Sequence, residues 1–242
     1  MIFSSFGLSM RKPLLFALLS LFVLTASAQV SSDYGYSVGV RAYTLKQMPR
    51  IMDELDSRYF TSAPLNGIML KFNDNQISYR LNGTYYKKSK QFFNNCETCE
   101  EANGKLVDYS FNIGFEKNFN YSRIQPYFGA DLGYRSNTFT GDLQNRNQLR
   151  AERLAQVETG PVQVDASKTG LVLSPFFGIK VSPVAQVSLF VEGNLDFFYS
   201  YERQETTLQD AGNTKSLKKY YKSEFLLNPV SAGIQFHFGN NK

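Results

Sequence analysis

The sequence predicts an all-β protein, an eight-stranded antiparallel up-and-down transmembrane β-barrel with long extracellular loops and short periplasmic turns. Three observations favour this fold. Apolar and polar residues alternate with period two in eight segments, the connections between the segments are alternately long and short, and a signal peptide precedes them. The chain of 242 residues is also 15% aromatic, and aromatic residues favour strands.

The first 28 residues have the organisation of a secretory signal peptide. A positive pair, Arg11 and Lys12, precedes an apolar run (residues 14–24) and the small residues Ala26-Ser27-Ala28. An apolar run of this length is too short to cross a bilayer as a helix, which argues against a membrane anchor. We therefore expect residues 1–28 to be removed and residues 29–242 to form the barrel domain.

The charge balance argues against a nucleic-acid partner. Two of the 26 basic residues and none of the 21 acidic residues lie in the signal peptide, so the rest of the chain carries 24 basic and 21 acidic residues, a net charge of +3. Nucleic-acid binding usually needs a clustered basic stripe, which this weak balance does not predict. The mean hydropathy of −0.30 is compatible with a transmembrane barrel, because only alternate residues of each strand face lipid.

The alternating segments define the eight expected strands. They span residues 34–44, 66–73, 76–87, 106–117, 124–135, 169–181, 186–201 and 225–238. The long connections are residues 45–65, 88–105, 136–168 and 202–224, and the short ones are residues 74–75, 118–123 and 182–185. This order places every long connection at one rim, as in bacterial outer-membrane barrels. A soluble sandwich, the alternative, does not predict such a regular rhythm.

One face of the strands is apolar and the other carries ionisable residues near mid-strand. Four basic and four acidic residues form this set: Arg41, Lys71, Arg80, Glu116, Asp131, Lys180, Glu192 and Asp196. A Lys or Arg that pointed at lipid near the midplane would cost about 2–4 kcal/mol. We therefore expect the apolar face to meet lipid and the charged residues to form an ion-pair network in the lumen. In a soluble barrel, the open alternative, the charged face would be solvated.

Several segments resemble a known family. These are ASAQ at residues 26–29, QPYFGADLGY at residues 125–134, the segment 174–197 and the final GIQFHF at residues 233–238. They resemble the small outer-membrane β-barrel proteins of the OmpA- and OmpX-like class, in the form found in Bacteroidetes-type Gram-negative bacteria. The resemblance implies an outer-membrane location in the cell envelope. It also implies insertion by the barrel-assembly machinery, which would read Phe236 and Phe238 as the insertion signal.

The sequence predicts no catalytic site, no metal site and no cofactor. The sole histidine, His237, falls at the short-turn rim without an evident Ser/acid constellation, and we expect it to line the lumen. Cys96 and Cys99 form a C-x-x-C in the second long connection. Behind a signal peptide this pair predicts a small disulfide, because two cysteines and a distant histidine do not complete a zinc site.

Three long connections carry further predictions. Residues 45–60 have roughly helical spacing of apolar residues, which predicts a short helix or an irregular loop over the barrel mouth. Residues 141–168 predict a surface loop that binds a partner, and the basic residues 215–222 predict either a contact with lipopolysaccharide phosphates or a solvated run. The expected function is therefore structural, or adhesion and interaction through the loops. A narrow pore, a lipid-modifying enzyme and a soluble secreted barrel are the alternatives.

Overall fold

The computed structural model describes residues 34–52, 60–93, 100–120, 122–145, 162–208 and 214–240. The predicted signal peptide and the predicted Cys96–Cys99 disulfide lie outside these residues. The strands are β1 (Tyr34–Gln47), β2 (Phe60–Asp74), β3 (Ile77–Phe93), β4 (Glu100–Asn118), β5 (Ile124–Asn145), β6 (Val162–Val184), β7 (Val187–Leu208) and β8 (Lys215–Asn240). Within the described ranges, no helix is long and apolar enough to cross a membrane.

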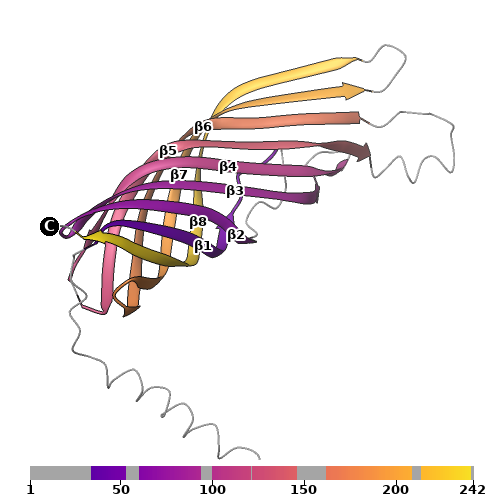
Figure 1. The fold of residues 1–242 in the computed structure, drawn as a ribbon. Helices are drawn as coiled ribbons and strands as arrows, with labels where there is room; N and C mark the ends of the chain where they lie inside the picture. The colour runs from indigo at the N-terminus through magenta and orange to yellow at the C-terminus, as the bar shows by residue number, and fades with distance from the viewer. Residues whose placement is uncertain are drawn as a thin grey trace, which may run out of the picture.

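The strands close into a barrel in the order of the sequence (Figure 1). Each strand is antiparallel to both of its neighbours, and β1 completes the ring against β8, where Val38 lies opposite Phe236. The β2–β3 turn is tight, and its residue Asn75 has a positive φ of 50°, which asparagine tolerates better than most residues. The predicted eight-stranded antiparallel up-and-down barrel is confirmed.

The outer face of the barrel is apolar around its middle, while the inner face is polar. On β4 the outward residues are Tyr109, Phe111, Ile113 and Phe115, which are 45–58% exposed. The inward residues that alternate with them include Asp108, Asn112 and Glu116, and all three are buried. A soluble barrel would place its apolar residues inside as a core. The observed arrangement suits an apolar medium outside, in agreement with the predicted orientation.

The last four strands continue well beyond their predicted ends. β5 runs to Asn145 and β6 begins at Val162, so much of the predicted loop 136–168 is strand. β7 runs to Leu208 and β8 begins at Lys215, so most of the predicted connection 202–224 is also strand. The prediction of long loops is therefore wrong for these residues, and it is also wrong for residues 88–93 and 100–105 of the predicted connection 88–105, which belong to β3 and β4. We call the part of the sheet beyond the apolar band the upper sheet. It contains residues 86–93 of β3, 100–107 of β4, 136–145 of β5, 162–169 of β6, 202–208 of β7 and 215–224 of β8.

On β5 and β6 the physical reason is that the two faces exchange polarity in the upper sheet. On β7 and β8 the inward residues there include Glu202, Gln204 and Glu224. On β5 the inward residues beyond Asn137 are Phe139, Gly141 and Leu143, and Phe139 and Leu143 are buried. The outward residues there are Thr138, Thr140 and Asp142. An apolar outward face therefore ends at the rim of the band, although the strand itself continues. The sequence-based prediction requires apolar residues at the outward positions of a strand, so the predicted strand ends where those positions become polar.

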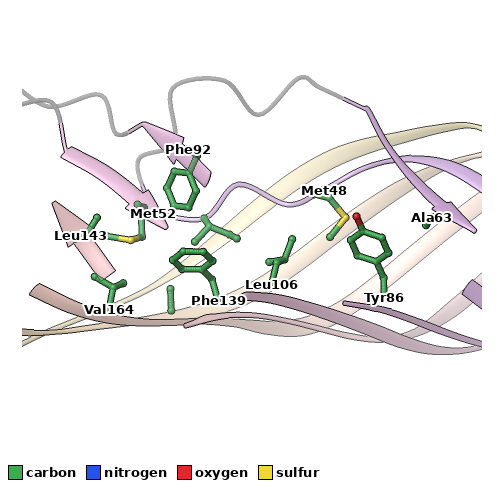
Figure 2. Close-up of a cluster of buried hydrophobic side chains, with 12 residues drawn as sticks. Met48, Met52, Ala63, Tyr86, Phe92, Leu106, Phe139, Leu143 and Val164 are labelled. Carbon is green, nitrogen blue, oxygen red and sulfur yellow. The ribbon is translucent and has the colours of Figure 1, made fainter. Parts of the chain in front are cut away.

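A hydrophobic cluster covers the inner face of the upper sheet (Figure 2). Its strand members are Ala63, Tyr86, Phe92, Ala102, Leu106, Phe139, Leu143, Val164 and Ala166. Met48, Ile51 and Met52, from the segment that follows β1, pack on them. The described part of the predicted helix 45–60 is strand as far as Gln47, and residues 48–52 are not helical. The described part of the segment predicted to cap the barrel mouth packs on the inner face of the upper sheet.

The upper sheet is open, because the β1–β2 hairpin does not reach as far as its neighbours. Pairing of β1 with β8 ends at Leu45 and Val230, and pairing of β2 with β3 ends at Gly67 and Thr84. Beyond these points β8 pairs only with β7, and β3 pairs only with β4. Both open edges are rich in lysine, with Lys87, Lys88 and Lys90 on β3 and Lys215, Lys218, Lys219 and Lys222 on β8.

Candidate functional site

The interior of the apolar band holds buried ion pairs. Seven of the eight charged residues predicted for the lumen lie in one connected group, which we call the lower cluster: Arg41, Lys71, Arg80, Glu116, Asp131, Lys180 and Glu192. They come from β1, β2, β3, β4, β5, β6 and β7, so the group extends across the ring. The eighth residue, Asp196, belongs to a separate group.

Arg80 is the centre of the lower cluster. Its Nε and Nη2 donate to the two oxygens of Asp131 at 2.7 Å and 2.6 Å, and its Nη1 donates to Glu192 Oε2 at 2.9 Å. The guanidinium lies 3.4 Å from the centre of the Phe176 ring. Arg80 is only 2% exposed, so these partners replace water almost completely. A planar guanidinium suits this two-point contact, which a lysine could not make.

The remaining contacts connect Arg80 to the rest of the lower cluster. Glu116 accepts from Lys71 on one oxygen and from Lys180 on the other, at 2.5 Å and 2.9 Å. Arg41 donates to Glu192 at 2.7 Å. Glu116 and Glu192 therefore each face two or more cations, an arrangement that compensates for removing the charges from water.

Asp196 lies in a second group, the middle cluster, which the sequence prediction largely missed. Arg135 donates to Asp108 through two nitrogens, at 2.9 Å and 3.2 Å, and to Asp196 at 3.1 Å. Lys46 donates to Asp108 at 2.6 Å. Lys46 falls in a predicted loop, and Asp108 and Arg135 fall at the ends of predicted strands. Asp108 and Arg135 are thus inside the predicted bounds although they are not among the predicted lumen charges, and a first strand extended by two residues would have included Lys46.

A third group lies in the upper sheet, where Lys168 contacts Glu202 at 3.1 Å and Glu224 at 2.7 Å. All three residues lie in connections that the sequence predicts to be loops. The interior pairs now comprise seven cations and seven anions: Arg41, Lys46, Lys71, Arg80, Arg135, Lys168, Lys180, Asp108, Glu116, Asp131, Glu192, Asp196, Glu202 and Glu224. These interior pairs are thus balanced in formal charge.

A polar cavity of about 50 Å³ lies between the lower and middle clusters. Arg80, Asp131, Arg135 and Asp196 are among its lining residues. This volume has room for a few water molecules. The Oδ1 atoms of the lining residues Asn112 and Asn228 are buried without a protein hydrogen-bond partner, and water would satisfy them.

His237 lies at the short-turn end between two serines. Ser37 Oγ is 2.8 Å from His237 Nδ1, and Ser188 Oγ is 2.6 Å from His237 Nε2. The sequence predicts a lumen-lining histidine at this rim without an evident Ser/acid constellation. Strand pairing of β8 with β1 and β7 adds the two serine neighbours, which the sequence alone did not indicate. Both serine side chains are buried, so neither hydroxyl is open to a substrate. Among the described residues, no carboxylate bonds to the imidazole and no group of His, Cys, Asp and Glu could hold a metal ion.

The residues of the predicted insertion signal lie on the outer face of β8. Phe238 is 48% exposed and Phe236 is 51% exposed. Phe238 stacks on Tyr36 of β1, with ring centres 6.0 Å apart. The pair therefore lies where the first and last strands close the ring.

The closed ring, apolar outside and ion-paired inside, defines the fold of an eight-stranded outer-membrane β-barrel. Solved structures similar to this chain include the following two. The outer membrane protein OprG from Pseudomonas aeruginosa is 9% identical with a TM-score of 0.52, and the match covers 87% of this chain and 100% of that chain. A major outer membrane protein from Thermus thermophilus is 11% identical with a TM-score of 0.50, covering 85% and 100%. No family model and no curated protein match the chain. At these identities the likeness is one of fold.

Proposed function

We propose that the chain is an outer-membrane β-barrel protein with a closed lumen, whose role is structural or interactive and not enzymatic. The observation that carries this proposal is the lower cluster, in which Arg80 of β3 connects Asp131 of β5 to Glu192 of β7 across the interior. Eight strands enclose a space that side chains can fill. A lumen filled in this way supports a membrane anchor for the upper sheet more than it supports a channel.

The location is supported by the outer face and by the proteins of like fold. The band of half-exposed aromatic and aliphatic residues fits the hydrocarbon core of a bilayer. The two similar structures are both described as outer membrane proteins. Membership of the Bacteroidetes-type family and insertion by the barrel-assembly machinery through Phe236 and Phe238 belong to this proposal. They rest on the resemblance of the sequence.

The partner-binding surface in this proposal is the upper sheet. It continues the barrel beyond the apolar band, and its outward residues are polar or charged, as on β5. The open edges and the connecting segments would present it to lipid headgroups, to lipopolysaccharide or to a protein partner. His237 takes no catalytic part in this proposal, because the two hydroxyls that it contacts are buried.

Two measurements test the proposal. Membrane fractionation, followed by gel mobility of the detergent-extracted protein with and without boiling, should find the chain in the outer membrane as a heat-modifiable barrel. The purified barrel in planar bilayers should show no steady ion conductance. Recovery in the periplasmic fraction would refute the membrane location. Steady conductance would favour the narrow pore, with the cavity between the two clusters as part of its path.

A further inference from the structure

The outer face of β7 and β8 carries an aromatic stripe that ends in a pair of cations. Phe197 packs against Phe225 with ring centres 5.1 Å apart. Tyr221 then contacts both Tyr199 and Tyr201, at 5.9 Å and 5.3 Å. One residue pair further from the barrel, on the same face, Arg203 lies directly opposite Lys219.

The register fixes both cations on the outer face. Arg203 lies between the inward residues Glu202 and Gln204, which are buried, so Arg203 points outward. Lys219 is its cross-strand partner and lies two residues from the outward Tyr221. On the neighbouring strand β6, Ser167 lies opposite Arg203 and adds a hydroxyl to the same row.

The local charge is positive, because three cations, Arg203, Lys215 and Lys219, share the outer face with two carboxylates, Glu205 and the Asp165 that lies opposite it on β6. Glu205 pairs with Arg203 at 2.7 Å and with Lys215 at 3.1 Å. Lys219 forms no ion pair with any residue that the structure describes. The group therefore has a net formal charge of +1, at the point where the outer face changes from aromatic to polar.

The opposite open edge repeats the arrangement. On β3 and β4 the outward residues Tyr85 and Tyr109 lie opposite each other. The next outward residues toward the upper sheet are Lys87 on β3 and Val107 on β4, which lie opposite each other, and Lys105 is the outward residue of β4 after Val107. Cations therefore follow the aromatic residues on both sides of the open sheet.

We infer that Arg203 and Lys219, above the stripe of Tyr199, Tyr201 and Tyr221, bind the phosphate of an outer-leaflet lipid whose acyl chains pack on the stripe. Tyrosines belong at the boundary between hydrocarbon and headgroups, so the next position outward lies at the level of the phosphates. A guanidinium and an ammonium both donate to phosphate oxygens. The occupant is a lipid because the two cations lie on the same outer face as the aromatic stripe and directly beyond it, so one molecule can contact both.

The test uses the full chain in a neutral detergent, titrated with diphosphoryl lipid A and followed by native mass spectrometry. Arg203→Gln and Lys219→Gln should each weaken binding about fivefold, and the double variant should weaken it about 25-fold. Lys117→Gln is the matched control, because Lys117 is an exposed, outward lysine at the other end of β4. It removes the same charge and should leave binding unchanged. The heat-modifiable mobility of each variant verifies that it is folded.

Two results would overturn the inference. The first is equal lipid binding by the wild type and the double variant, or an equal loss in Lys117→Gln, which would indicate general attraction to a basic protein. The second is displacement of the lipid by millimolar inorganic phosphate, which would indicate a site for free phosphate. The inference rests on the proposed membrane location, but its test is separate. A chain that fractionates with the outer membrane and fails the titration overturns this site alone.

Discussion

Arg80 of β3 and Asp131 of β5 form a two-point ion pair even though β4 runs between their strands. The register explains how they meet, because Gly114 of β4 lies opposite both Arg80 and Asp131. Strands that flank a third strand are about 9–10 Å apart. A glycine between them leaves the space above β4 empty, and the long arginine side chain crosses it.

Replacing Gly114 by alanine should destabilise the barrel. A Cβ at this position would lie 2.1 Å from Asp131 Oδ1 and 2.3 Å from the Ala130 carbonyl oxygen. We expect the free energy of unfolding to fall by about 1–3 kcal/mol. Urea titration in detergent, followed by heat-modifiable mobility, measures it. Gly83→Ala is the control, because its nearest atom would be 3.9 Å away. A similar loss in both variants would contradict the argument from close approach.

Neutralising Asp131 should be costly, because it leaves Arg80 with a weaker partner inside the barrel. Asp131→Asn should lower the free energy of unfolding by about 3–5 kcal/mol. Asp142→Asn is the control on the same strand, where the carboxylate is exposed on the outer face. A change within about 0.5 kcal/mol is expected there. The chain contains no tryptophan, so far-ultraviolet circular dichroism or gel mobility is used to report unfolding in place of tryptophan fluorescence. An equally small effect at both positions would mean that water replaces the carboxylate in the interior.

Truncating Phe139 should loosen the upper sheet without opening the barrel. Phe139 is fully buried in the hydrophobic cluster and packs on Phe92 with ring centres 5.2 Å apart. Phe139→Ala should cost about 3–5 kcal/mol of local stability. Limited proteolysis should then cut the upper sheet faster, while heat-modifiable mobility persists. Phe111→Ala removes an equal ring from the outer face, where Phe111 is 58% exposed, and should not increase cutting. Equal cutting in both variants would show that the cluster does not hold the sheet.

The lysines of the open β8 edge should oppose edge-to-edge pairing between copies of the chain. Lysine on an exposed edge strand disfavours pairing with another strand. The double variant Lys218→Val and Lys222→Val should therefore form dimers or larger species in detergent, as measured by light scattering after size exclusion. Lys105→Val with Lys117→Val is the matched control, because β4 is paired on both sides. If the β8 variant stays as monomeric as the control, the lysines do not protect this edge.

The fold could be predicted from the sequence because a membrane-facing strand has a local pattern of alternating apolar and polar residues. The alternation in residues such as Tyr109, Phe111 and Ile113 depends only on the period of a strand and on the surrounding solvent. The same reasoning pointed to Arg80, Asp131 and Glu192 as interior residues. It stopped too early at Arg135, because beyond that residue the apolar side chains turn inward and the polar ones turn outward. The predicted disulfide of Cys96 and Cys99 remains a prediction.

The sequence by itself determined the strand count, the up-and-down order and the face of each strand in the band, since these follow from short-range periodicity. Only the tertiary structure decided which charges meet. Arg80 finds Asp131 across Gly114, Asp196 pairs with Arg135 and not with the lower cluster, and His237 lies between Ser37 and Ser188. These contacts depend on the register of strands far apart in the sequence. A one-residue slip in pairing changes every partner without changing any local pattern.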